Sequence, residues 1–335
     1  MVRILQQRPV RFVERTITRG AHTPQRGGAV GGPQRWTMTL TLRRRTTHEY
    51  TIPAPKLHDP RVEQLLACFS APAGERTPPR VLLAAAHPDD ETMGPGGMLP
   101  RLAGSIELLH VTDGAPRHRR LWGRNEHRTW DEYAGARRAE LLRALDVAGI
   151  DPARAHRLGV LDAEASLDMA GLARALRDAI DRFRPDVLMA HPYEGGHTDH
   201  DAVAFAAHAA CRLLRRDGAA APALVEFTSY HNLRGERIYN RFLPWDGAPV
   251  TEVMLTPDER DRKRRMFDCY PTQHGVLRDA PVRHERYRPA PRYDFGSAPH
   301  AGRLRYELYP QGMKGREWRA LAMQALGDLG LSRFY

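Results

Sequence analysis

The chain has few cysteines for its length. Only three of its 335 residues are cysteines, namely Cys68, Cys211 and Cys269, and no two of them form a C-x-x-C pair. This scarcity excludes a disulfide scaffold and a zinc site built from cysteine ligands. It is typical of a protein in the reducing cytoplasm, which is the compartment we expect.

Long apolar runs are also lacking. No segment reaches the ~18 consecutive apolar residues that a transmembrane helix needs, so we expect no membrane span. Residues 1–20 are rich in arginine without a continuous apolar stretch, and we expect no secretory signal. The composition, with 41% hydrophobic and 27% charged residues, is that of a globular protein.

Lysine is scarce and arginine is abundant. Lys56, Lys263 and Lys314 are the only lysines among 51 basic residues, and the formal net charge is +11. A basic protein can bind nucleic acid or acidic substrates. Here the basic residues are spread along the chain without a long block, which favours a bias toward arginine codons instead. We therefore expect no nucleic-acid partner.

Residues 1–78 differ in character from the rest of the chain. Alternating residues at 36–42 and a second segment at 49–52 predict a β-hairpin, and 60–69 predicts a short helix. The segment is too small for a hydrophobic core of its own. We interpret it as an N-terminal appendage that packs on the main domain or on a second subunit, which would make a homo-oligomer.

Residues 79–335 alternate between short apolar runs and amphipathic segments. The predicted strands are 81–86, 106–111, 156–160, 187–190 and 224–230. Strands that alternate with helices predict βαβ units. We therefore expect an α/β fold, a Rossmann-like and largely parallel sheet with helices on both faces. Thr256, Pro257 and Glu259 predict the capped start of a further helix.

Polar residues follow each of the five predicted strands. They occupy 87–91, 112–114, 161–162, 191–200 and position 231. In open parallel sheets, ligands bind outside the carboxyl ends of the strands, where these side chains would meet. Because His and Asp suit a divalent metal such as zinc, the sequence predicts a metal site at this edge.

The prediction of a metal site depends mainly on two pairs of residues. Asp89 and Asp90 are adjacent, so one carboxylate can bind the metal while the other faces a water molecule and takes its proton. His197 and His200 are three residues apart, so they share one face of a helical first turn.

The segments AHPDDET (86–92) and GHTDH (196–200) resemble the paired signatures of the PIG-L/LmbE-like family of metal-dependent N-deacetylases. The resemblance runs from about residue 80 to at least residue 273. It implies a metal-dependent hydrolase that removes the N-acetyl group from an amino sugar, such as N-acetylglucosamine, or from a small sugar conjugate. It also implies Zn2+ as the cofactor, with Fe2+ as the alternative.

The resemblance implies roles for individual residues. His87, Asp90 and His200 would bind the metal. Asp89 would be the general base, and His197 would stabilise the oxyanion or protonate the leaving amine.

Arg137 and Asp162 resemble the substrate-contacting residues of the family. Two alternatives are open at the first position: Arg138 could take the place of Arg137, or Arg137 is a solvated helix arginine. Residues 287–329 resemble a C-terminal extension of some bacterial members and have no assigned role.

Two other functions compete with the amino-sugar deacetylase. One is an amidase that acts on a thiol conjugate or a modified natural product. The other is a basic binding module without catalysis on a degenerate hydrolase fold. The complete set of His87, Asp89, Asp90, His197 and His200 argues against the module, because a decayed site would lose some of these residues.

Overall fold

The computed structural model describes residues 2–5, 59–122, 126–309 and 312–333. Eight of its strands form one sheet in the order β1-β9-β10-β6-β5-β2-β3-β4, and β7 pairs with β8 in a separate hairpin. The strands are β1 (Val2–Leu5), β2 (Val81–Ala85), β3 (Ile106–Pro116), β4 (Ala155–Asp162), β5 (Val187–Ala190), β6 (Ala223–Phe227), β7 (Tyr230–Leu233), β8 (Glu236–Tyr239), β9 (Val250–Met254) and β10 (His284–Pro289).

The five strands predicted from the apolar runs form the parallel part of the sheet. Strand β2 lies at its centre and pairs in parallel with β3 and β5, while β4 and β6 continue the sheet on either side. The predicted α/β class with a largely parallel sheet is confirmed.

Strands β1, β9 and β10 add an antiparallel edge that the sequence did not reveal. The reason lies in its charged residues. Arg286 of β10 pairs across the strands with Glu252 of β9, with 2.6 Å between nitrogen and oxygen. Charged pairs of this kind stabilise a half-exposed edge but hide the apolar pattern by which strands are predicted.

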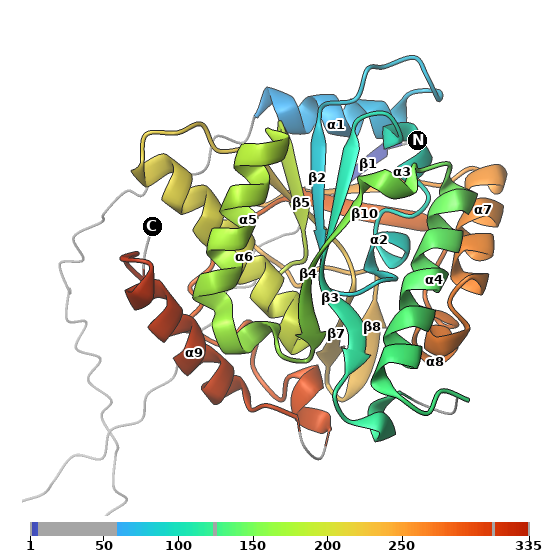
Figure 1. The fold of residues 1–335 in the computed structure, drawn as a ribbon. Coiled ribbons are helices and arrows are strands. Elements are labelled where there is room, and N and C mark those ends of the chain that lie inside the picture. Colours follow the sequence, from blue (N-terminus) through green and yellow to red (C-terminus); the bar gives the residue numbers. More distant parts are fainter. Residues whose placement is uncertain (1, 6–58, 123–125, 310–311, 334–335) are drawn as a thin grey trace, which may run out of the picture. The chain divides into compact units, whose positions relative to one another are not determined.

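Helices cover both faces of the sheet (Figure 1). They are α1 (Pro60–Ser70), α2 (Asp90–Met93), α3 (Leu99–Leu102), α4 (Trp130–Ala148), α5 (Met169–Phe183), α6 (Thr198–Arg216), α7 (Pro257–Asp268), α8 (His274–Leu277) and α9 (Gly315–Asp328). The predicted start of α7 is confirmed, since Thr256 and Glu259 form a reciprocal capping box with Pro257 in the first turn. Within the described parts of the chain, none of these helices has both the length and the apolar character that crossing a membrane requires.

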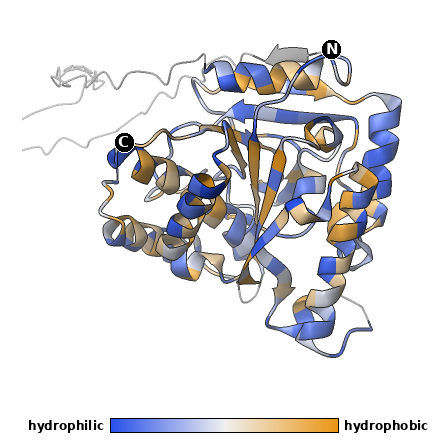
Figure 2. Cartoon of the chain, turned by 45° about the horizontal axis from the view of Figure 1, so that its top comes forward, coloured by the Kyte–Doolittle hydropathy of each residue, from blue (hydrophilic) through white to orange (hydrophobic). Residues whose placement is uncertain are grey.

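The hydrophobic core lies in two layers, one on each face. Successive side chains of β2 alternate between them: Leu82 and Ala84 join one layer, and Leu83 joins the other. This burial on both faces explains the continuous apolar run of the strand. Figure 2 shows the resulting apolar strands between amphipathic helices.

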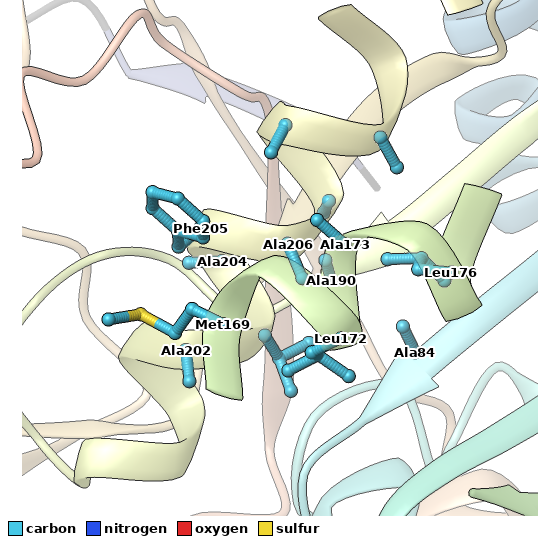
Figure 3. Close-up of a cluster of buried hydrophobic side chains, with 14 of the residues drawn as sticks. Ala84, Met169, Leu172, Ala173, Leu176, Ala190, Ala202, Ala204, Phe205 and Ala206 are labelled. Carbon is cyan, nitrogen blue, oxygen red and sulfur yellow. The ribbon is translucent and has the colours of Figure 1, made fainter. Parts of the chain in front are cut away.

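The layer that contains Ala84 is built mainly from α5 and α6. Met169, Leu172 and Leu176 of α5 face the small side chains of α6, among them Ala202 and Ala206 (Figure 3). Alanines let the two helices approach closely, so α6 is held firmly along its length. This matters for the site, because α6 begins inside the second His-rich segment.

The predicted helix over 60–69 is present as α1, and it contributes to the other layer. Leu65 and Phe69 are buried there, and the Phe69 ring lies 4.9 Å from that of Tyr287 on β10. The predicted hairpin at 36–42 and 49–52 lies outside the described residues. The division of the chain at residue 78 stays a prediction.

Candidate metal centre

The two His-rich segments meet because their strands are neighbours. One segment follows β2 and leads into α2, and the other follows β5 and leads into α6. Since β2 and β5 pair in parallel, their carboxyl ends lie side by side. The predicted edge of the sheet therefore carries both motifs.

His87, Asp90 and His200 converge on one point. His87 Nδ1 lies 3.3 Å from Asp90 Oδ2, His200 Nε2 lies 3.2 Å from Asp90 Oδ1, and the two ring nitrogens are 3.3 Å apart. Ligand atoms bound at ~2.1 Å to one ion are about 3.0–3.4 Å apart for octahedral to tetrahedral angles. The three buried side chains therefore fit a divalent cation.

Asp89 lies beside this triad and faces a different partner. Its Oδ1 is 3.5 Å from Nη2 of Arg137, whereas the oxygens of Asp90 face His87, His191 and His200. The two adjacent carboxylates thus diverge, as their order in the sequence predicts. Without a metal, burial raises the pKa of Asp89 to about 8, against the opposing effect of Arg137. A cation bound beside it would lower this pKa and so favour the ionised carboxylate.

A strained backbone holds Asp89 in this position. Its φ is 132°, a value that residues other than glycine rarely adopt. Its backbone N–H donates to Glu91 Oε2 at 3.0 Å, and Glu91 is itself buried between the Tyr270 hydroxyl and the His110 ring. Such strain persists only where the surroundings fix it, and it often marks functional sites.

The other nitrogen of His87 contacts two carboxylates. Nε2 lies 3.2 Å from Asp162 Oδ1 and 3.2 Å from Asp199 Oδ2. Asp199 in turn accepts hydrogen bonds from the backbone N–H groups of Ala163 and Ala165. Carboxylates behind a ligating histidine fix its ring and its tautomer. No role was predicted for Asp199 from the sequence, although its place between His197 and His200 could have indicated one.

Asp162, predicted as a substrate contact, thus lies against a predicted ligand. Burial alone would raise its pKa, but His87 and His197 lower it below the ordinary value. Its role toward a substrate stays a prediction.

His197 lies at the open side of the centre. Its ring meets that of His87 edge-on at 4.6 Å, and its side chain is 24% exposed, more than those of His87 and His200. Its Nδ1 accepts a hydrogen bond from the backbone N–H of Asp199 at 3.2 Å. A neutral imidazole that accepts at Nδ1 carries its proton on Nε2, so this nitrogen can donate to a ligand.

His191 is a further histidine at the site, in one of the polar segments but without a predicted role. Its Nε2 lies 3.3 Å from Asp90 Oδ2, and its ring stacks on that of His200 at 4.1 Å. Three groups of described residues at this edge have the spacing of metal ligands: His87 with His197 and His200, His87 with Asp162, His197 and Asp199, and Asp90 with His191 and His200.

Arg137 is buried rather than solvated. Only 1% of its surface is exposed, and it donates to the backbone oxygens of Gly114 and Pro88. The alternative interpretation as a solvated helix arginine is therefore wrong. Arg138 instead reaches the backbone oxygen of Ala155, at the opposite end of the parallel sheet. The predicted substrate contact of Arg137 stays a prediction.

The C-terminal part of the chain supports the second motif from behind. The indole Nε1 of the fully buried Trp318 on α9 donates to the backbone oxygen of Thr198, and its ring stacks on Tyr193 at 5.1 Å. The N–H of Arg305 donates to the oxygen of Gly195. The loop between β5 and α6 is thus held by residues about 100 positions later in the chain, for which the sequence offered no role.

The parallel sheet, with two His and one Asp converging at its carboxyl edge, makes this an α/β protein with a candidate metal site. Residues 82–211 match the model of the PIG-L family, described as GlcNAc-PI de-N-acetylase. The resemblance predicted from the two motifs is confirmed.

Curated relatives match just over a third of the chain. Two proteins named 1D-myo-inositol 2-acetamido-2-deoxy-alpha-D-glucopyranoside deacetylase are similar to it. The one from Mycobacterium sp. (strain KMS) is 31% identical over 147 residues, and the match covers 36% of this chain and 46% of the relative. The one from Segniliparus rotundus is 34% identical over 152 residues, with 36% and 47% covered. The chain thus spans about half the length of the curated relatives it matches.

Among solved structures, a deacetylase of the teicoplanin biosynthesis pathway is similar at 20% identity and a TM-score of 0.49. The match covers 64% of this chain and 99% of that chain.

Proposed function

We propose that the protein is a metal-dependent hydrolase that removes the N-acetyl group from an amino sugar or a small sugar conjugate. One observation carries the proposal: the ligand atoms of His87, Asp90 and His200 converge at 3.2–3.3 Å, with the separate buried carboxylate of Asp89 beside them. The match to the PIG-L model and the deacetylase names of the curated relatives support the same reaction.

Two histidines and one carboxylate suit Zn2+, and the same donor set with open positions suits Fe2+. We propose zinc as the metal and ferrous iron as the alternative. A divalent cation bound there would act as a Lewis acid toward the amide carbonyl and would lower the pKa of water.

Asp89 is the proposed general base. Its carboxylate lies beside the cluster formed by Asp90 and the histidines, and Arg137 restrains it from 3.5 Å away. A carboxylate that is fixed beside the reacting centre can accept a proton from the attacking water molecule.

His197 is the proposed partner of the carbonyl oxygen. Its Nε2 carries the proton when Nδ1 accepts from Asp199, so it can donate a hydrogen bond to the developing oxyanion. In its alternative role, His197 would start as the imidazolium and give its second proton to the leaving amine, which returns the ring to the neutral form. Arg137 and Asp162 are the proposed substrate-binding residues. Arg137 also holds Asp89 and the loop at Pro88 in position.

The test combines metal content with turnover. Purified wild type is expected to hold about one zinc or iron ion per chain and to release acetate from a panel of N-acetylglucosamine conjugates, while His87→Ala loses both properties. A panel that includes acylated thiol conjugates separates the amino-sugar reaction from the rival amidase reaction. Turnover that persists in thoroughly metal-free protein would refute the proposal.

A further inference from the structure

The hairpin β7–β8 follows β6 and stands next to the metal centre. The ring of Tyr230, its first residue, lies 5.4 Å from that of His200. The guanidinium of Arg237 lies on the other strand of the hairpin, 5.3 Å from the Tyr230 ring. A single aromatic side chain thus contacts both a predicted metal ligand and an arginine.

Arg237 is held in place without being neutralised. Its Nη1 donates to the Tyr239 hydroxyl at 2.8 Å, and that hydroxyl donates to the backbone oxygen of Val276. Its Nε is buried without an acceptor, and no carboxylate of the described residues lies within ion-pair distance. Because arginine stays charged at any working pH, a half-buried positive charge remains here without a counter-ion in the described chain.

Arg305 repeats this pattern on a neighbouring segment. Its Nε is also buried without an acceptor, and no described carboxylate forms an ion pair with it. Its guanidinium lies 5.8 Å from the ring of Tyr309, while its backbone is tied to Gly195 in the loop of the second motif. The amide of Asn232 on β7 donates to the backbone oxygen of Arg303, which joins this segment to the hairpin.

Three arginines elsewhere in the described chain show the usual arrangement, in which a carboxylate accepts from the guanidinium. Arg288 pairs with Glu226 at 2.7 Å, Arg286 with Glu252 at 2.6 Å, and Arg101 with Glu259 at 2.6 Å. Burial of a guanidinium is costly unless an acceptor satisfies its donors, and planar oxyanions are the acceptors that match its fork. Among the described residues, Arg237 and Arg305 are the arginines whose Nε is buried without an acceptor. Arg237 lies over the Tyr230 ring that adjoins His200, and the backbone of Arg305 is bonded to Gly195, so a ligand at the centre can supply the missing acceptor.

We propose that Arg237 and Arg305 bind an oxyanion group of the substrate, a carboxylate or a phosphate, on the part of the molecule that is not hydrolysed. The inference rests on the proposed function and narrows it: the substrate is an anionic derivative of an N-acetylated amino sugar. Tyr230 and Tyr309, whose rings adjoin these two guanidinium groups, would contact the part that joins the anion to the sugar.

The first test compares turnover of three sugars. N-acetylglucosamine is neutral, N-acetylglucosamine 6-phosphate carries a phosphate, and N-acetylmuramic acid carries a carboxylate. Wild type is expected to prefer at least one anionic sugar in kcat/KM. In Arg237→Gln and Arg305→Gln, the ratio of kcat/KM for that sugar over the neutral one falls about ten- to hundredfold, mainly through KM, as expected for lost charge-assisted hydrogen bonds.

Arg237→Lys and Arg234→Gln are the matched controls. The lysine keeps the charge but not the fork, so it restores part of the preference. Arg234 lies at the exposed tip of the same hairpin, and its replacement removes the same charge without a change in the ratio. A preference that is absent in wild type, or that Arg234→Gln lowers as much as Arg237→Gln, overturns the inference.

A second measurement needs no turnover. Calorimetry compares the affinity of wild type for glucosamine, glucosamine 6-phosphate and muramic acid, which lack the acetyl group. Tighter binding of an anionic sugar that is lost in the double variant Arg237→Gln/Arg305→Gln supports the anion site even if no sugar is hydrolysed. Equal affinities overturn it, while hydrolysis of neutral N-acetylglucosamine would still uphold the deacetylase.

Discussion

The replacement Asp89→Asn separates the proposed base from the proposed metal ligands. It removes the proton-accepting charge and keeps the shape of the side chain. A positioned general base contributes about 10²- to 10⁴-fold to a rate, so we expect kcat to fall within that range. The metal content is expected to stay at the wild-type value, because Asp89 faces Arg137 and the three converging ligand atoms belong to other residues.

The structure also indicates that this variant will fold. Asparagine and aspartate have similar backbone preferences, so the replacement adds no new strain at the φ of 132° found at this position. Arg137 keeps its hydrogen bonds to Gly114 and Pro88, so it is not left without acceptors. Folding is checked by the thermal midpoint, and bound metal is measured by mass spectrometry on the same sample that is used for kinetics.

Asp151→Asn is the matched control for this experiment. Asp151 allows the same replacement of a carboxylate by an amide. It lies just before β4, at the opposite end of the parallel sheet, and accepts a hydrogen bond from the backbone N–H of Ala153. Its replacement should leave kcat unchanged. Wild-type turnover by metal-loaded Asp89→Asn would refute the assignment of the base, and loss of metal in step with turnover would make Asp89 a ligand instead.

Three other predictions concern the ligands, the supporting helix and acid stability. His200→Ala removes one of three converging donors, so the metal content after dialysis should fall well below one per chain, and retention of the wild-type content would contradict the ligand set. Trp318→Phe removes the indole hydrogen bond to α6 and part of a buried ring, which should lower the free energy of unfolding by about 2 kcal/mol and weaken metal binding. Denaturant and metal titrations measure the two effects. The matched control Trp245→Phe, at an exposed position, should change neither. Arg333 holds the pKa of Asp294 down at about 2, below the ordinary 3.8, so this pair stabilises the fold above about pH 4 and the benefit disappears as the pH falls through 2. The free energy of unfolding of Asp294→Asn should therefore lie below that of wild type at neutral pH, and the two values should converge near pH 2. A difference that stays constant over the whole pH range would disprove the linkage.

The parallel half of the fold could be predicted because its strands are buried on both faces. A short, uninterrupted apolar run such as that of β2 is typical of a strand covered by helices on each side, and the residue after each run then falls at one edge of the sheet. That reasoning placed the segments 87–91 and 191–200 at one edge of the sheet, whereas the choice of His87, Asp90 and His200 within them came from the resemblance to the family.

The antiparallel edge and the supporting contacts could not be predicted in this way. Strand β10 carries Arg286 and Arg288, whose charges are satisfied by partners that only the tertiary structure reveals. The position of Arg137 is a similar case, because a buried arginine and a solvated one look the same in a helical pattern. The contact of Trp318 with Thr198 joins residues 120 positions apart, so no local signal could indicate it.

The adjacency of β2 and β5 also has a consequence for the time course of folding. The ring nitrogens of His87 and His200 meet across a separation of 113 residues. At the usual pace of ~5–20 residues per second, a ribosome needs roughly 6–23 s to synthesise the chain between them. During that time the nascent chain holds the first His-rich segment without the ligand that His200 supplies. Bringing the two segments together also closes a long loop, which costs conformational entropy that the formation of a local helix does not. We expect a nascent chain that stops before α6 to release metal readily, and capture to begin only once the second motif has docked beside the first.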